Sequence, residues 1–153
     1  MAYWLMKSEP EAFGIDDLKK RGIEPWSGVR NYQARNYMRD QMHDGDLTFL
    51  YHSNCNLPGI YGIMEVVGKP YPDPTQYDHK SPYFDAKAKK EEPRWQMVDV
   101  KYSRHLRRPI LLAELRAQSE LLKGMLLLAP GSRLSVQPVS TAHWNHILML
   151  EAR

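Results

Sequence analysis

The chain has 153 residues, of which 42% are hydrophobic and 25% charged, a composition that excludes a disordered chain, a collagen-like repeat and a coiled coil. The net charge of +3 allows an anionic partner such as nucleic acid without requiring one. Cys55 is the only cysteine, so no internal disulfide can form and we expect a reducing compartment. We recognise neither a targeting segment nor an apolar run of membrane length, and therefore expect a cytoplasmic protein with one domain, residues 1–153.

The first elements along the chain are short. Residues 3–7 predict an opening strand, which the following Glu-Pro pair ends. Residues 14–22 predict a helix of one to two turns, because acidic residues open it, basic residues close it and a glycine follows. A brief extended piece is expected over residues 24–27.

The middle of the chain is rich in strand-like sequence. Residues 31–42 fit an amphipathic helix. Residues 47–53 and 59–68 both read as strands, and the short linker between them favours a hairpin. Residues 69–93 carry five prolines without any periodicity and are expected to be irregular, as long functional loops often are.

The last part of the chain combines both types of element. Alternating residues predict a strand over 95–106, a helical composition follows over 111–122, and 134–139 is a short strand. A Ser-Thr pair caps a final helix over 141–150. Strands thus dominate the middle, helices lie at the edges, and only one parallel crossover is a candidate. We therefore expect an α+β fold built on a small curled sheet or barrel.

The segment WSGVRNYQARN carries the first candidate site. Trp26 offers an indole, Gly28 permits close backbone approach, and Arg30 and Asn31 arrive at the start of a helix. Helix starts offer free N–H groups to anions, while asparagine hydrogen-bonds base edges and arginine adds charge and stacking. The alternative interpretation is structural, with Trp26 in the core, Gly28 in a turn, and Arg30 and Arg35 on a solvated face.

Two strand ends supply weaker candidates. Lys7 and Ser8 close the first expected strand, where they would line the mouth of a pocket or simply face the solvent. Tyr51, His52 and Ser53 read as polar walls near the end of another strand.

Three basic runs are candidates for phosphate contact, and the last of them places Lys101 and Arg104 along an expected strand. Charge runs are more often solvated faces, so both interpretations stay open. The six histidines are dispersed, and no glycine-rich phosphate loop or nucleophile elbow occurs. We therefore expect no metal site and no cofactor.

Several of these blocks together resemble the EVE domain family. The matching stretches run in order along essentially the whole chain: KSEP (7–10), WSGVRNYQARN (26–36), YHS (51–53), GIYG (59–62), SPYFD (81–85), LSVQPV (134–139) and Trp144. The resemblance implies a PUA-like fold, a small β-barrel with flanking helices, related to YTH and ASCH domains. It also implies a pocket that accepts a modified nucleobase in DNA or RNA without covalent chemistry, and hence no enzyme.

On this basis we predict two sets of site residues. The base-binding set is Lys7, Ser8, Trp26, Gly28, Val29, Asn31, Tyr51, His52, Ser53, Tyr83 and Trp95. The phosphate-binding set is Arg30, Arg35, Lys101 and Arg104. In this hypothesis Trp26 stacks on the base, whereas Asn31 and Ser8 hydrogen-bond its edge. Lys7 and Arg30 hold flanking phosphates.

Two other functions stay open at this point. An ASCH-like hydrolase would act on RNA or modified nucleosides, with Lys7 and either His52 or Tyr51 as its acid–base pair. A protein-interaction module would instead present a contiguous apolar patch over an empty barrel mouth. For the reader of a modified base we expect a monomer that binds nucleic acid and no membrane.

Overall fold

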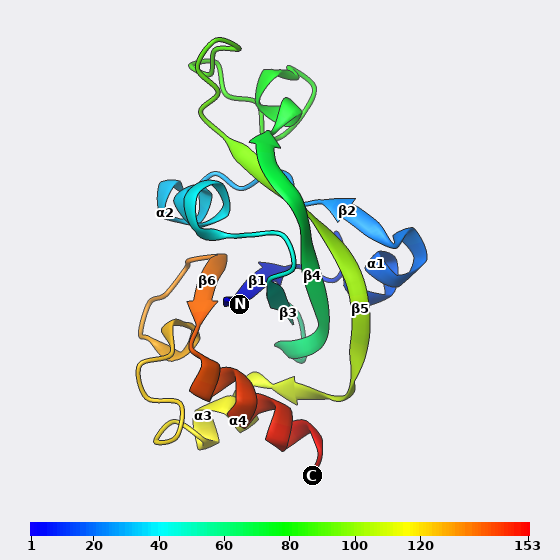
Figure 1. Cartoon of the computed structure of the whole chain (residues 1–153), viewed down its shortest axis with the longest axis vertical. Helices are drawn as coiled ribbons and strands as arrows, with labels where there is room; N and C mark the ends of the chain where they lie inside the picture. The colour runs from blue at the N-terminus through cyan, green and yellow to red at the C-terminus, as the bar shows by residue number, and fades with distance from the viewer.

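The computed structural model describes residues 1–153 and places six strands in one mixed sheet (Figure 1). The strands are β1 (Tyr3–Ser8), β2 (Ile23–Pro25), β3 (Leu47–His52), β4 (Gly59–Pro72), β5 (Gln96–Leu111) and β6 (Val136–Val139). Their order across the sheet is β2-β5-β4-β3-β1-β6. β1 and β3 are parallel, and all other neighbours are antiparallel. The edge strands β2 and β6 do not pair with each other, so the sheet is open. The term barrel, expected from the sequence, therefore describes this sheet only loosely.

Four α-helices flank this sheet and complete the expected α+β architecture. They are α1 (Ile15–Arg21), α2 (Tyr32–Asn36), α3 (Leu112–Ala117) and α4 (Thr141–Glu151). Figure 1 shows α3 and α4 together at the end of the molecule that holds the C-terminus, with α2 farther along the same side. Each helix is too short or too polar to cross a membrane.

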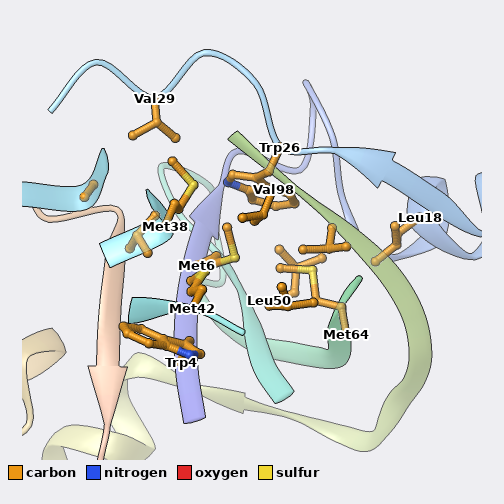
Figure 2. Packing of buried hydrophobic residues seen from close by; sticks show 14 of the residues in the cluster. Trp4, Met6, Leu18, Trp26, Val29, Met38, Met42, Leu50, Met64 and Val98 are labelled. Carbon is orange, nitrogen blue, oxygen red and sulfur yellow. The ribbon is translucent and has the colours of Figure 1, made fainter. Parts of the chain in front are cut away.

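β1 is buried on both faces of the sheet, so its apolar residues are continuous instead of alternating. Trp4 and Met6 face one hydrophobic cluster, which Met38 joins from the turn after α2 (Figure 2). Leu5 faces the other cluster, which includes Trp144 of α4. β1 thus lies between the two clusters, and its last residues, Lys7 and Ser8, are half-buried.

The expectation of an irregular stretch over 69–93 is wrong for its first part, because β4 continues to Pro72. β3 pairs with β4 as far as Glu65, and Val66 still exchanges backbone hydrogen bonds with Gly45 and Asp46. Beyond Val66 one side of β4 has no strand partner. Proline is tolerated on such a free edge, since no ladder hydrogen bond is lost there. Tyr71 and Pro72 still pair with β5, and the two strands form the long arm seen in Figure 1.

The expected helix over 31–42 is divided into α2 and a π-helical turn, Tyr37–Gln41. The N–H of Met42 donates to the carbonyl of Tyr37, which widens the helix by one residue at this point. Ala34, Met38 and Met42 nevertheless pack in the same cluster, so the amphipathic pattern was read correctly.

The strand expected over 95–106 is longer than its pattern suggests. β5 continues to Leu111, because Ile110 pairs with Ile60 at the start of β4 after a register shift. α3 consequently begins at Leu112 and ends at Ala117, short of the expected residue 122.

Candidate nucleic-acid interface

A cavity of about 500 Å³ opens where the end of β1 meets the chain that links β2 to α2. This volume lies in the range of small-molecule sites. Residues from both predicted sets line the cavity: Lys7, Ser8, Trp26, Gly28, Val29, Arg30 and Tyr83. The structure therefore brings together the KSEP block, the first half of the WSGVRNYQARN block and the loop around Tyr83, which lie far apart in the sequence.

Three aromatic side chains contribute to the cavity. Trp26 is only 8% exposed and packs in the first core cluster (Figure 2), so it is a core residue of which a small part lines the cavity. The ring of Phe13 meets Trp26 edge-on at 6.2 Å between centroids. Tyr83 is 44% exposed and lies close against Gly28, whose positive φ of 84° and missing side chain allow that approach.

The residues that line the cavity include polar groups of opposite hydrogen-bonding character. The ammonium of Lys7 lies 6.0 Å from the ring centroid of Tyr51 and makes no hydrogen bond or ion pair within the chain, and burial lowers its pKa. The carboxylate of Glu24 accepts two hydrogen bonds of 2.9 Å from Arg21, which hold it in place. The Ser8 hydroxyl donates to the carbonyl of Phe13 at 2.7 Å, so its lone pairs can accept from a ligand. The residues around the cavity thus include one lysine without an ionic partner and at least two hydrogen-bond acceptors.

A buried carboxylate fixes the loop that lines this cavity. Asp73 is fully buried and accepts hydrogen bonds from the Gly28 N–H at 2.7 Å and from Arg30 at 3.2 Å. Burial raises the pKa of Asp73, but the hydrogen bonds from Thr75, Gly28 and Arg30 outweigh this effect and lower it. Arg30 also donates to the carbonyl of Tyr83 at 2.9 Å. Arg30, predicted as a phosphate contact, therefore joins two loops and shares its charge with Asp73.

Five residues of the predicted base-binding set lie outside the cavity, and most of them have their polar atoms or rings engaged elsewhere. The side chain of Asn31 caps α2 by accepting from the N–H of Ala34 at 2.9 Å. Tyr51 is buried in the second cluster, on the other face of the sheet. His52 accepts from the N–H at the start of α1 at 3.2 Å, and the backbone N–H of Ser53 donates to Ser8.

The fifth such residue, Trp95, is buried beneath α2. Its indole N–H donates to Asp85 at 2.8 Å, and its ring stacks on Tyr32 with 4.9 Å between centroids. Arg35, predicted as a phosphate contact, lies against these two rings on the surface of α2.

The two predicted phosphate contacts on β5 differ from each other. Arg104 forms an ion pair of 2.6 Å with Glu151 of α4, and its hydrogen bonds lower the pKa of that carboxyl. Lys101 is exposed and pairs with Ile23 of β2, one step from Glu24 at the cavity. Of the two, only Lys101 has its charge free for a ligand.

Sequence reasoning missed three residues of the site, namely Phe13, Glu24 and Asp73. Glu24 could have been predicted from the extended piece over 24–27. Residues i and i+2 of a strand share a face, so Glu24 is expected on the same face as the candidate Trp26. The Asp-Pro-Thr sequence at Asp73 indicates a turn, and the turn forms through hydrogen bonds to Thr75. Nothing local, however, connects this carboxylate to Gly28, which lies 45 residues away.

The model of the EVE domain matches residues 2–150. The chain belongs to the EVE domain family. This EVE domain is 42% identical to human thymocyte nuclear protein 1, across 99% of the chain and 75% of the human protein. It is 48% identical to a protein of known crystal structure from Pseudomonas syringae, with a TM-score of 0.94 and coverage of 98% of this chain and 99% of that one.

The human THYN1 protein has also been solved, in a crystal structure of its complex with DNA that contains 5-methylcytosine. The EVE domain described here is 42% identical to it, with a TM-score of 0.96 over 100% of this chain and 99% of that one. These likenesses confirm the PUA-like α+β fold expected from the sequence. An ASCH protein from Zymomonas mobilis, 10% identical with a TM-score of 0.57, shares the fold alone.

Proposed function

We propose that this EVE domain is a non-enzymatic reader that accepts a modified cytosine of DNA in the cavity at the end of β1. The observation that carries the proposal is the combination of aromatic walls with a free lysine and a fixed carboxylate in one cavity of about 500 Å³. The human THYN1 protein, which is 42% identical, was crystallised with DNA that contains 5-methylcytosine, and this supports cytosine as the base.

The polar groups of the cavity match the edge of a cytosine. Its exocyclic amino group donates hydrogen bonds, which carboxylates such as Glu24 accept, and its ring nitrogen and carbonyl accept from a donor such as Lys7. The methyl group adds apolar surface, for which Phe13 and Tyr83 supply contacts. Since a base in a duplex cannot reach such a cavity, the cytosine must leave the stack to be bound.

Binding of matched DNA duplexes tests the proposal. A duplex with a central 5-methylcytosine should bind about 10- to 200-fold more tightly than the unmodified duplex, because one methyl group in a hydrophobic pocket contributes that much. Glu24→Gln and Lys7→Met should weaken binding to both duplexes. The exposed residues Glu11 and Lys123 lie outside the cavity, so Glu11→Gln and Lys123→Met are the matched controls.

Three outcomes would contradict this function. Equal affinity for the two duplexes would show that the protein does not distinguish 5-methylcytosine from cytosine. Unchanged binding by Glu24→Gln and Lys7→Met together would place the base outside the cavity. Equal or tighter binding of an RNA strand with the same sequence and modification would contradict the choice of DNA.

A hydrolase of the ASCH type is the second candidate, and one observation favours it. Burial lowers the pKa of Lys7, which is what a lysine needs to act as a general base near neutral pH. Its Nζ atom lies 6.0 Å from the ring centroid of Tyr51, whereas His52 is occupied at the start of α1. Incubation with RNA and with acetylated cytidine decides between the two functions. A product that Lys7→Met abolishes would establish the hydrolase.

A further inference from the structure

A row of alternating aromatic rings and a guanidinium leads from the cavity to the surface of α2. Tyr83 and Arg30 both line the cavity, and the guanidinium carbon of Arg30 lies 5.6 Å from the Tyr83 ring centroid. The same carbon lies 5.3 Å from the centroid of Trp95, on which Tyr32 stacks at 4.9 Å. The row therefore connects the proposed base site with Tyr32, a residue to which the proposed reader function assigns no role.

Tyr32 ends this row with one face of its ring uncovered. The residue is 52% exposed, and its hydroxyl makes no hydrogen bond within the chain. Trp95 covers the inner face. The guanidinium carbon of Arg35 lies 4.8 Å from the Tyr32 centroid and 5.9 Å from that of Trp95. A group over the outer face would be much farther from Trp95, so Arg35 lies beside the stack and leaves the outer face open.

The charge around Tyr32 suits a nucleic-acid strand. Arg35 donates to the side chain of Asn36 and to the carbonyl of Arg94, and it has no carboxylate partner. Burial lowers the pKa of Arg35, and the charges of Arg39 and Arg94 act in the same direction, while the Asp40 carboxylate opposes them. An aromatic face beside an uncompensated cation is the arrangement on which proteins stack the bases of single-stranded DNA.

We propose that the outer face of Tyr32 stacks on a nucleotide that flanks the cytosine held in the cavity, while Arg35 contacts the phosphate between them. This inference rests on the proposed reader function and extends it from one base to a short stretch of the same strand. A flanking nucleotide is the occupant we propose, because the DNA strand that delivers a base to the cavity must leave it along a neighbouring surface. The row formed by Tyr83, Arg30 and Trp95 connects the cavity with such a surface at Tyr32. Stacking of this kind adds affinity without reading sequence.

Single-stranded oligonucleotides with a central 5-methylcytosine test this inference. In one oligonucleotide the two neighbours of the central base are thymidines, and in the other they are abasic residues. With thymidine neighbours, Tyr32→Ala should weaken binding about 5- to 150-fold, the effect of losing one base–aromatic stack. With abasic neighbours, Tyr32→Ala should bind within about twofold of the wild type, because the flanking base that Tyr32 would contact is absent.

Two further variants separate stacking from folding. Tyr32→Leu still covers Trp95 but lacks an aromatic face, so it should keep the melting temperature and show the weak binding of Tyr32→Ala. Tyr32→Phe should restore wild-type affinity, because the hydroxyl has no partner. Leu121→Ala, a substitution of a residue that is 64% exposed and lies after α3, is the control for lost surface area.

A fluorescent base gives an independent readout. With 2-aminopurine next to the methylated cytosine, its fluorescence should be quenched by the wild type and by Tyr32→Phe, but not by Tyr32→Leu. Equal losses of affinity for the thymidine and abasic oligonucleotides upon Tyr32→Ala, or equal quenching by Tyr32→Leu, would overturn the inference. Replacing the central 5-methylcytosine with cytosine tests the reader function separately. If the wild type binds both equally, the reader function fails while the result for Tyr32 still stands.

Discussion

Gly28 determines how closely the rim residue Tyr83 can approach the cavity. A Cβ atom at this position would lie 2.7 Å from the Tyr83 ring, and the backbone φ of 84° is strained for any other residue. Gly28→Ala should therefore displace Tyr83 and weaken DNA binding. Gly124→Ala is the matched control, since Gly124 has a similar φ of 89° but open space at its Cβ position. Both variants should melt at lower temperature than the wild type, and only Gly28→Ala should bind less DNA.

Trp26 contributes more to stability than its place in the cavity suggests. Because it is 8% exposed and packs in the first core cluster, Trp26→Ala should cost about 3–5 kcal/mol of unfolding free energy. Urea unfolding of the free protein measures this cost, and Trp26→Phe should lose less. An unchanged unfolding midpoint, together with loss of selectivity for the methylated base, would instead favour a purely ligand-binding indole.

The contrast between Asn31 and Gly28 shows what the sequence reveals about the site. The sequence places both in one motif, but only Gly28 lines the cavity. Asparagine before a helix is a common N-cap, and the side chain of Asn31 accepts a hydrogen bond from the N–H of Ala34. This capping role could be predicted from the sequence. His52 is different, because the backbone N–H of Ile15 that occupies it comes from a distant part of the chain. Hydrogen bonds between residues close in sequence could thus be predicted, whereas those between distant parts of the chain could not.

At the scale of elements, the positions of strands follow from the sequence better than their ends do. β1, β3 and the start of β4 lie where branched and aromatic residues alternate or cluster, and the hairpin between β3 and β4 is confirmed. The sequence did not predict the extensions of β4 to Pro72 and of β5 to Leu111, because prolines and a glycine in these segments are typical of loops. Only the pairing of the two strands along the arm makes those residues extended.

His52 makes the contact between β3 and α1 dependent on pH. Its Nε2 atom accepts from the N–H of Ile15 at 3.2 Å, which requires a neutral ring. Burial lowers the pKa of His52, an effect that the nearby Asp16 carboxylate partly opposes. The unfolded chain gains a proton below about pH 6.5 while the folded chain resists it, so this contribution to stability is complete above that pH and is lost as the pH falls.

Urea unfolding between about pH 7.5 and pH 5 measures this effect. The wild type should lose stability across this range by more than His52→Gln, whose amide oxygen accepts the same hydrogen bond without titrating. Other groups titrate in both proteins and cancel in the difference between the two curves. Parallel curves would show that His52 is protonated equally in the folded and unfolded chains.

At the scale of the whole molecule, part of the positive charge is compensated within the fold. In the basic run on β5, Arg104 pairs with Glu151 and Arg108 with Glu114, whereas Lys101 and Arg107 have no carboxylate partner. Arg35 on α2 has no such partner. Arg35 is therefore available to phosphates, whereas the charge of Arg104 is already held by Glu151.

Salt dependence of DNA binding tests this distribution. Each phosphate contact with a single strand contributes about 0.7 to the slope of log K against log salt concentration. Arg35→Ala should reduce the slope by about that amount. Arg104→Ala should leave the slope unchanged and lower the melting temperature, because Glu151, whose side chain is 6% exposed, loses its cation. Titrations at several salt concentrations, beside melting curves of the free variants, give both quantities. If Arg104→Ala reduces the slope instead, the ion pair with Glu151 opens on binding and the DNA reaches as far as β5.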